Sequence, residues 1–179
     1  VNGWTRDGAR LIFERADSAG KAALWSRDRD GAGAESPLGA ATASESGSDL
    51  SPDGRWLAFV SDQSGSSEVY LRRFDGSGGA LRVSSLGGGA PRWRGDGREL
   101  FYVDGGGRLM AVPIGSLDPP APGAAALLFD AHLDDFAAWL ATATKRHAPP
   151  VVAALAHLEF VAVHPFNDQQ QGSRHEGNR

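Results

Sequence analysis

Near the end of the sequence lies a group of histidines and carboxylates whose side chains could do chemistry: His157, His164, Asp168, His175 and Glu176. Imidazole and carboxylate groups are ligands that zinc accepts, so a metal site is one interpretation. The spacing of these residues matches no compact pattern of zinc ligands, and the polar sequence around the last two predicts a disordered tail. We therefore expect no zinc site here, and we expect His157 to have a structural role on a helix.

The stretch His164-Pro165-Phe166-Asn167-Asp168 carries a more specific signal. Together with the Ala-rich stretch before it, this stretch resembles the signature of Fic-domain proteins, which reads His-Pro-Phe, any residue, Asp or Glu, and then a Gly-Asn-Gly-Arg type of loop. Members of that family transfer AMP, or a related phosphate-containing group, to a protein hydroxyl. The resemblance implies that His164 is the general base that takes the proton from the target hydroxyl. It also implies that Asp168 holds Mg²⁺ on the phosphates of ATP.

The sequence departs from the Fic signature directly after Asp168. Positions 169–172 are Gln-Gln-Gln-Gly, and a Gly-Asn-Arg triplet follows only at the end of the chain. The resemblance assigns phosphate contacts to Asn178 and Arg179 only if this late triplet replaces the loop. Because the phosphate-binding half of the signature is missing, we expect an incomplete, inactive Fic-like segment. The alternative is an active Fic-type transferase (a protein adenylyltransferase) that uses ATP and Mg²⁺.

Two helices are predicted to carry this motif. Apolar residues at 133, 136, 137 and 140 form one stripe at helical spacing, and the Pro149-Pro150 pair ends that helix. The apolar stretch 151–163 predicts a second, buried helix that leads into His164. Residues 130–168 are therefore predicted to be a two-helix segment, and residues 169–179 a disordered tail.

The first 129 residues are organised differently, as an internal repeat. Asp-Gly pairs occur at residues 7, 53 and 96, each followed by a short polar stretch and an apolar strand. Their spacings of 46 and 43 residues are the period of a four-stranded propeller blade. Asp-Gly tolerates positive φ and makes tight hairpin turns, so each unit predicts a turn between two strands.

Two of these units, Ser51–Asp62 and Pro91–Tyr102, resemble the TolB-like, WD-repeat-like propeller blade. The run from 50 to 115 is similar to the sensor propellers attached to bacterial serine/threonine kinases. The resemblance covers residues 1–129, and it implies a fold and an interaction role rather than chemistry. The predicted fold class is therefore β with a C-terminal α segment: a partial propeller of about three four-stranded blades, followed by two α-helices.

Several residues of the repeats invite a functional interpretation. The aspartates of the three Asp-Gly pairs could serve catalysis or bind calcium, but turn formation explains them, and we expect that role. The interspersed arginines are expected on a solvated strand face. The repeated tryptophans are expected to pack between blades rather than stack on a ligand; they are Trp4, Trp56 and Trp93.

Composition narrows the function further. The chain has no cysteine and no Gly-x-Ser-x-Gly motif, which excludes disulfides, thiolate zinc sites, a cysteine nucleophile and that class of serine hydrolase. The net charge of −4 gives no reason to expect nucleic acid or an acidic membrane as partner. The sequence shows no basic-then-apolar leader and no membrane-spanning run, so a cytoplasmic location is favoured.

Three blades are fewer than the four to eight of a closed propeller, and they leave open sheet edges. We therefore expect a protein partner or self-association. The abrupt change of pattern near residues 129–132 favours a fragment or a fused gene product. The function predicted from sequence is a protein-interaction or sensory module joined to an incomplete Fic-like segment.

Overall fold

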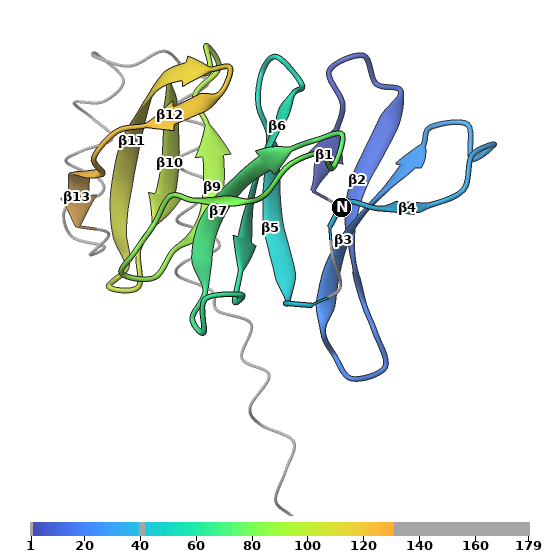
Figure 1. Ribbon diagram of the computed structural model, residues 1–179, viewed down its shortest axis with the longest axis horizontal. Coiled ribbons are helices and arrows are strands. Elements are labelled where there is room, and N and C mark those ends of the chain that lie inside the picture. Colours follow the sequence, from blue (N-terminus) through green and yellow to red (C-terminus); the bar gives the residue numbers. More distant parts are fainter. Residues whose placement is uncertain (1, 40–41, 131–179) are drawn as a thin grey trace, which may run out of the picture.

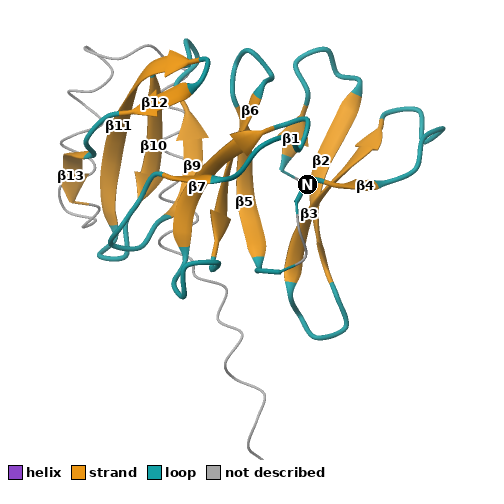
Figure 2. Cartoon of the chain, viewed as in Figure 1, coloured by secondary structure: helices purple, strands orange, loops and turns teal. Residues whose placement is uncertain are grey.

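The computed structural model describes residues 2–39 and 42–130, which form three antiparallel β-sheets (Figures 1 and 2). The first sheet, blade 1, contains β1 (Gly3–Trp4), β2 (Arg10–Ala16), β3 (Ala22–Asp28) and β4 (Ser36–Pro37). Blade 2 contains β5 (Glu45–Leu50), β6 (Trp56–Ser61), β7 (Glu68–Arg73) and β8 (Leu81–Arg82). Blade 3 contains β9 (Gly89–Trp93), β10 (Glu99–Val103), β11 (Arg108–Leu117) and β13 (Ala126–Asp130).

Each blade is a meander of four strands, as the repeat predicts. The fourth strand of blade 3 is β13, which pairs with β11, while β12 (Pro120–Pro122) pairs with the far end of β11. The blades stand in chain order, with blade 2 between the other two (Figure 1). No helix among residues 2–39 and 42–130 is long and apolar enough to cross a membrane. The two predicted helices after Asp130 and the tail lie outside the described residues.

The Asp-Gly pairs make the hairpin turn between the first and second strands of each blade, which confirms that prediction. Gly8, Gly54 and Gly97 have φ values of +66°, +76° and +73°, a region that glycine enters without steric cost. Each glycine N–H donates to the carbonyl three residues earlier, at 2.8 Å in all three turns. The same chemistry therefore sets the start of the second strand in every blade.

Side chains alternate between the two faces of each blade, because successive residues of a strand point to opposite sides. We call the face turned toward the lower-numbered blade, and the equivalent face of blade 1, the preceding face. The opposite face of each blade is the following face. In blade 2, Leu57 and Phe59 lie on the preceding face and pack against blade 1. Trp56 and Ala58 lie on the following face and pack against blade 3.

Two apolar clusters between the blades form the core. The cluster between blades 1 and 2 consists of Ile12, Leu24, Leu38, Leu57, Phe59 and Tyr70. The cluster between blades 2 and 3 consists of Trp56, Ala58, Val69, Leu71, Trp93, Leu100, Tyr102, Val112 and Ile114. A third, smaller cluster of Phe101, Leu109 and Ala111 is buried on the following face of blade 3. Burial between blades, rather than within one sheet, thus holds the three units together.

Candidate functional site

The residues that the Fic-like motif singles out lie outside the part of the chain that the structure describes. These are His164, Asp168, Asn178 and Arg179, and the same holds for His157. Within residues 2–39 and 42–130, no group of three or more His, Cys, Asp or Glu side chains is arranged to hold a metal ion.

The turn aspartates are engaged in their own turns. Asp7 accepts hydrogen bonds from the Thr5 hydroxyl at 2.6 Å and from the Ala9 N–H at 3.0 Å, and these bonds lower the pKa of its carboxyl. At Asp53, partial burial acts to raise the pKa of the carboxyl. The hydrogen bonds from the Ser51 hydroxyl and from Arg55 outweigh this effect and lower the pKa. Turn formation, as expected from sequence, accounts for both carboxylates.

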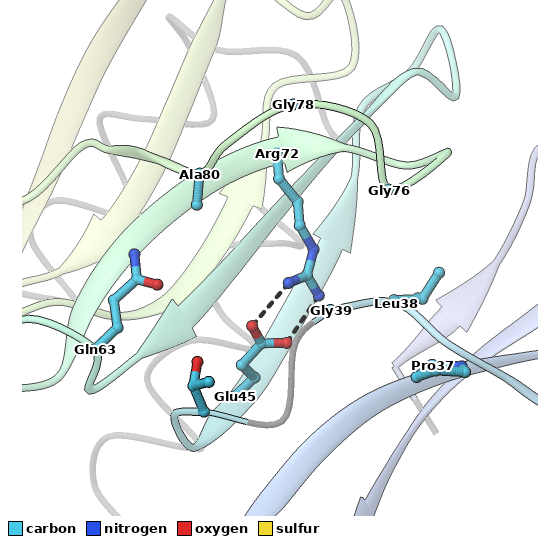
Figure 3. Close-up of a pocket in the computed structure, with 10 residues that line it drawn as sticks. Pro37, Leu38, Gly39, Glu45, Gln63, Arg72, Gly76, Gly78 and Ala80 are labelled. Atoms are coloured by element: carbon cyan, nitrogen blue, oxygen red, sulfur yellow. Dashed lines mark hydrogen bonds and ion pairs between the residues drawn. The ribbon is translucent and has the colours of Figure 1, made fainter.

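A cavity of about 370 Å³ lies at the boundary between blades 1 and 2 (Figure 3). An ion pair forms part of its lining: Arg72 on β7 donates to both carboxylate oxygens of Glu45 on β5, at 2.7 and 2.8 Å. Both side chains are at least nine-tenths buried. A two-pronged pair of this kind fixes both groups and leaves their sum uncharged.

Packing holds the Arg72 guanidinium in place on two further sides. Its central carbon lies 4.2 Å from the centre of the Phe59 ring, within the range of a cation–π contact. A Cβ at Gly39 would overlap the guanidinium, so a larger residue at this position would displace the Arg72 side chain. The expectation that the arginines lie on a solvated strand face is therefore wrong for Arg72. The sequence of a strand does not indicate that one of its arginines will pair with a carboxylate 27 residues earlier.

The preceding face of blade 1 is the second candidate site, and it is built from four positions that recur in every blade. The first three positions follow from the Asp-Gly repeat, and the fourth from the residue paired with the third across the hairpin. The positions are Trp4, Leu11, Phe13 and Trp25 in blade 1, Leu50, Leu57, Phe59 and Tyr70 in blade 2, and Trp93, Leu100, Tyr102 and Met110 in blade 3.

These four positions pack against the preceding blade in blades 2 and 3. The set of blade 2 belongs to the cluster with blade 1, and the set of blade 3 belongs to the cluster with blade 2. The set of blade 1 belongs to none of the three clusters of the described residues. Trp4 is 50% exposed, whereas its equivalent Trp93 is 8% exposed. The prediction that the repeated tryptophans pack between blades is therefore confirmed for Trp56 and Trp93, whereas Trp4 packs against no other blade of the described residues.

Charged groups border this open face. The Arg15 guanidinium lies 3.6 Å from the centre of the Trp25 ring and pairs with Glu35 at 2.7 Å. Arg27 lies 3.9 Å from the same carboxylate. Leu11, Phe13 and Trp25 are half-buried. The face thus has an apolar centre and a polar rim, the anatomy of a protein-binding surface.

Comparison with solved structures defines the class of this fold. A putative TolB from Agrobacterium tumefaciens matches with a TM-score of 0.62 and 25% identity, over 72% of this chain and 48% of that one. TolB from Acinetobacter baumannii matches with a TM-score of 0.54 and 19% identity, over 73% of this chain and 32% of that one.

The described residues are therefore TolB-like β-propeller blades, as the repeats indicate. The chain spans about half the length of the Agrobacterium protein and about a third of the Acinetobacter protein. No protein-family model matches the sequence, and no curated protein matches it. Neither these two TolB structures nor any family model supports a Fic domain in this chain.

Proposed function

We propose that the three blades are part of a protein-interaction module, and that the preceding face of blade 1 is a docking surface for a further propeller blade or a partner protein. One observation carries the proposal: the four positions that bury side chains against a neighbouring blade in blades 2 and 3 hold Trp4, Leu11, Phe13 and Trp25 in blade 1, with no blade of the described chain opposite them. Large apolar side chains gathered in an exposed patch mark an interaction site.

The residue types support the same function. Three of the four side chains are aromatic. Aromatic residues are enriched at protein interfaces, and tryptophan is among those that contribute most of the binding energy. Arg15 over the Trp25 ring extends this patch with a flat, positively charged group, and arginine is likewise enriched at such surfaces. At the cavity, by contrast, the charged groups of Glu45 and Arg72 are already paired with each other.

Sedimentation velocity of the full chain tests this function. An open aromatic face without its partner drives reversible self-association, so we expect the average mass to rise with protein concentration. Phe13→Asp places a charge in the centre of the face and should abolish this rise. Leu86→Asp is the matched control, because Leu86 is 74% exposed on another loop and its replacement should change nothing.

A chain that stays monomeric at every concentration, or one whose self-association is the same in Phe13→Asp and the unchanged protein, would contradict the proposed surface. Circular dichroism of both variants checks that the blades remain folded. The variant comparison separates the face of blade 1 from the open edges of the sheets, since a substitution on a face leaves the edge strands intact.

The second candidate function is a Fic-type transferase, and it is carried by the residues 164–168 alone. In that function His164 would take the proton of a protein hydroxyl whose oxygen attacks the α-phosphate of ATP, so that AMP is transferred and pyrophosphate leaves. Asp168 would hold Mg²⁺ on the phosphates, and Asn178 and Arg179 would contact them. Incubation with labelled ATP, Mg²⁺ and candidate target proteins tests it, with His164→Ala as the control. Label that is lost in His164→Ala supports the transferase, and the same label in both proteins, or none, contradicts it.

A further inference from the structure

We infer that the hairpin of residues 114–122 is a strap that reaches from blade 3 onto blade 2 and controls how readily the boundary between these two blades opens. The strap consists of the far end of β11 together with β12, and it lies at the top of blade 3 in Figure 1. Both sides of this boundary lie within the described residues.

The strap is an addition to the repeat. In each blade, one residue of the third strand pairs with the first residue of the second strand, and these residues are Asp28, Arg73 and Pro113. From there to the fourth strand, blades 1 and 2 use only residues 29–35 and 74–80, whereas blade 3 uses residues 114–125. Blade 3 therefore has additional chain at the end of the sheet where the Asp-Gly turns lie.

The tip of the strap contacts blade 2 at Trp56. The indole N–H of Trp56 donates to the carbonyl of Leu117 at 2.6 Å, and the Leu117 side chain packs against the apolar cluster between blades 2 and 3. Trp56 is only 7% exposed. Because a buried indole N–H needs a partner, the strap supplies the acceptor that this side chain requires in the core.

Two further contacts place the strap where the turns of blades 2 and 3 meet. The Arg55 guanidinium of blade 2 lies 3.3 Å from the Asp118 carboxylate. A Cβ at Gly97, in the turn of blade 3, would lie 3.2 Å from Leu117 Cδ1 and 3.8 Å from Pro52 Cδ of blade 2. An exposed ion pair contributes little by itself, so the hydrogen bond and the apolar contacts of Leu117 account for most of the attachment.

The boundary between blades 1 and 2 has no counterpart of the strap in the described part of the chain. Phe74 begins the equivalent stretch of blade 2 and packs against the first cluster, as Ile114 packs against the second. The hydrogen bonds of residues 74–80, however, stay within blade 2. Release of the strap should therefore affect the second boundary alone.

The docked and the released strap differ in what blade 2 exposes. With the strap docked, Trp56 and Ala58 on the following face are 7% and 0% exposed. With the strap released, the Trp56 N–H loses its acceptor, and Leu117 no longer covers the end of the cluster. A local opening of this kind needs less free energy than unfolding of the whole chain. The strap thus sets the opening of one boundary without changing the other.

Thiol labelling measures the opening of each boundary separately, because the chain contains no cysteine. Ala58→Cys places a thiol in the second boundary and Leu57→Cys places one in the first, at neighbouring positions of β6 that are both 0% exposed. Each substitution is made in the full chain with the strap, and in a chain where a copy of residues 75–80 replaces residues 115–125. The rate of reaction with the thiol reagent DTNB under native conditions reports how often each boundary opens.

Without the strap, we expect the thiol at position 58 to react about tenfold faster or more, since a hydrogen bond and an apolar contact are both lost. The thiol at position 57 should react at an unchanged rate. An unchanged rate at position 58 overturns the inference. Equal acceleration at both positions also overturns it, because that is the result of a general loss of stability.

Trp56→Phe is the second variant, and it decides the question if circular dichroism shows that the chain without the strap does not fold. It keeps the whole strap and removes only the indole N–H that binds the Leu117 carbonyl. We expect about fivefold faster labelling at position 58, as the loss of one hydrogen bond implies, and none at position 57 beyond the rate of the unchanged background. Equal rates with and without Trp56→Phe at position 58, or the same acceleration at position 57, overturn the inference.

Discussion

Phe13 and Phe59 hold the same position in successive blades, yet they have different surroundings. Phe59 is completely buried between blades 1 and 2, with the Arg72 guanidinium 4.2 Å from the centre of its ring. Phe13 is half-buried and belongs to no cluster of the described residues. The same side chain at equivalent positions thus shows how much burial a neighbouring blade contributes.

Alanine substitutions at these two positions should therefore have different costs. Phe59→Ala removes a ring from a packed interior and leaves a cavity, so we expect it to lower the free energy of unfolding by about 3–5 kcal/mol. Phe13→Ala removes a ring that is still in contact with water, and we expect a loss of about 1 kcal/mol or less. Urea denaturation followed by tryptophan fluorescence, at a concentration where the chain is monomeric, measures both. Equal losses would contradict the assignment of Phe13 to an open face.

The repeat made the blades predictable from sequence. Asp-Gly turns depend on local chemistry, and the apolar strands after Asp7, Asp53 and Asp96 depend on period-two alternation, so both are visible in the letters. The fourth strand of blade 3, Ala126–Asp130, likewise has a local signal, because residues 127–129 are an apolar run after a proline-rich segment.

The candidate sites were not predictable in the same way. The exposure of Trp4 depends on which neighbour a blade has, and the repeat gives Trp4 and Trp93 the same expectation. The pairing of Glu45 with Arg72 depends on two strands that are brought together by the β5–β6–β7 meander. The Fic-like prediction at His164 and Asp168 stays a prediction, because those residues lie outside the described chain.

The buried pair of Glu45 and Arg72 predicts an asymmetry between single and double substitutions. Glu45→Ala leaves the Arg72 charge buried without a partner, so we expect a loss of about 3–5 kcal/mol in the free energy of unfolding. Glu45→Leu together with Arg72→Leu removes both charges, and should cost less than Glu45→Ala alone. Chemical denaturation of the two proteins checks this. A double variant that is less stable than the single one would show that the pair contributes more than its own desolvation.

Asp49 should make the protein less stable as the pH rises. Burial raises the pKa of its carboxyl, although the hydrogen bond from the backbone N–H of Trp93 and the charge of Arg92 partly oppose this effect. The folded state therefore binds the proton more tightly than the unfolded state, and stability falls between the ordinary pKa of 3.8 and the raised one. Asp49→Asn, which can still accept the Trp93 hydrogen bond, should be more stable than the unchanged protein at pH 7 and equal to it below about pH 3.5.

Asp53 should give the opposite dependence on pH. Although partial burial acts against it, the bonds from Ser51 and Arg55 lower the pKa of its carboxyl, so ionised Asp53 stabilises the turn. That contribution is fully present above the ordinary value of 3.8 and is lost as the pH falls through the lowered one. Asp53→Asn should be less stable than the unchanged protein at pH 7, by about 1 kcal/mol for the weakened hydrogen bonds, and the difference should shrink on acidification. Thermal unfolding from pH 2 to pH 7 compares the two asparagine variants directly. If Asp49→Asn and Asp53→Asn shift the midpoint in the same direction at pH 7, one of the two assigned environments is wrong.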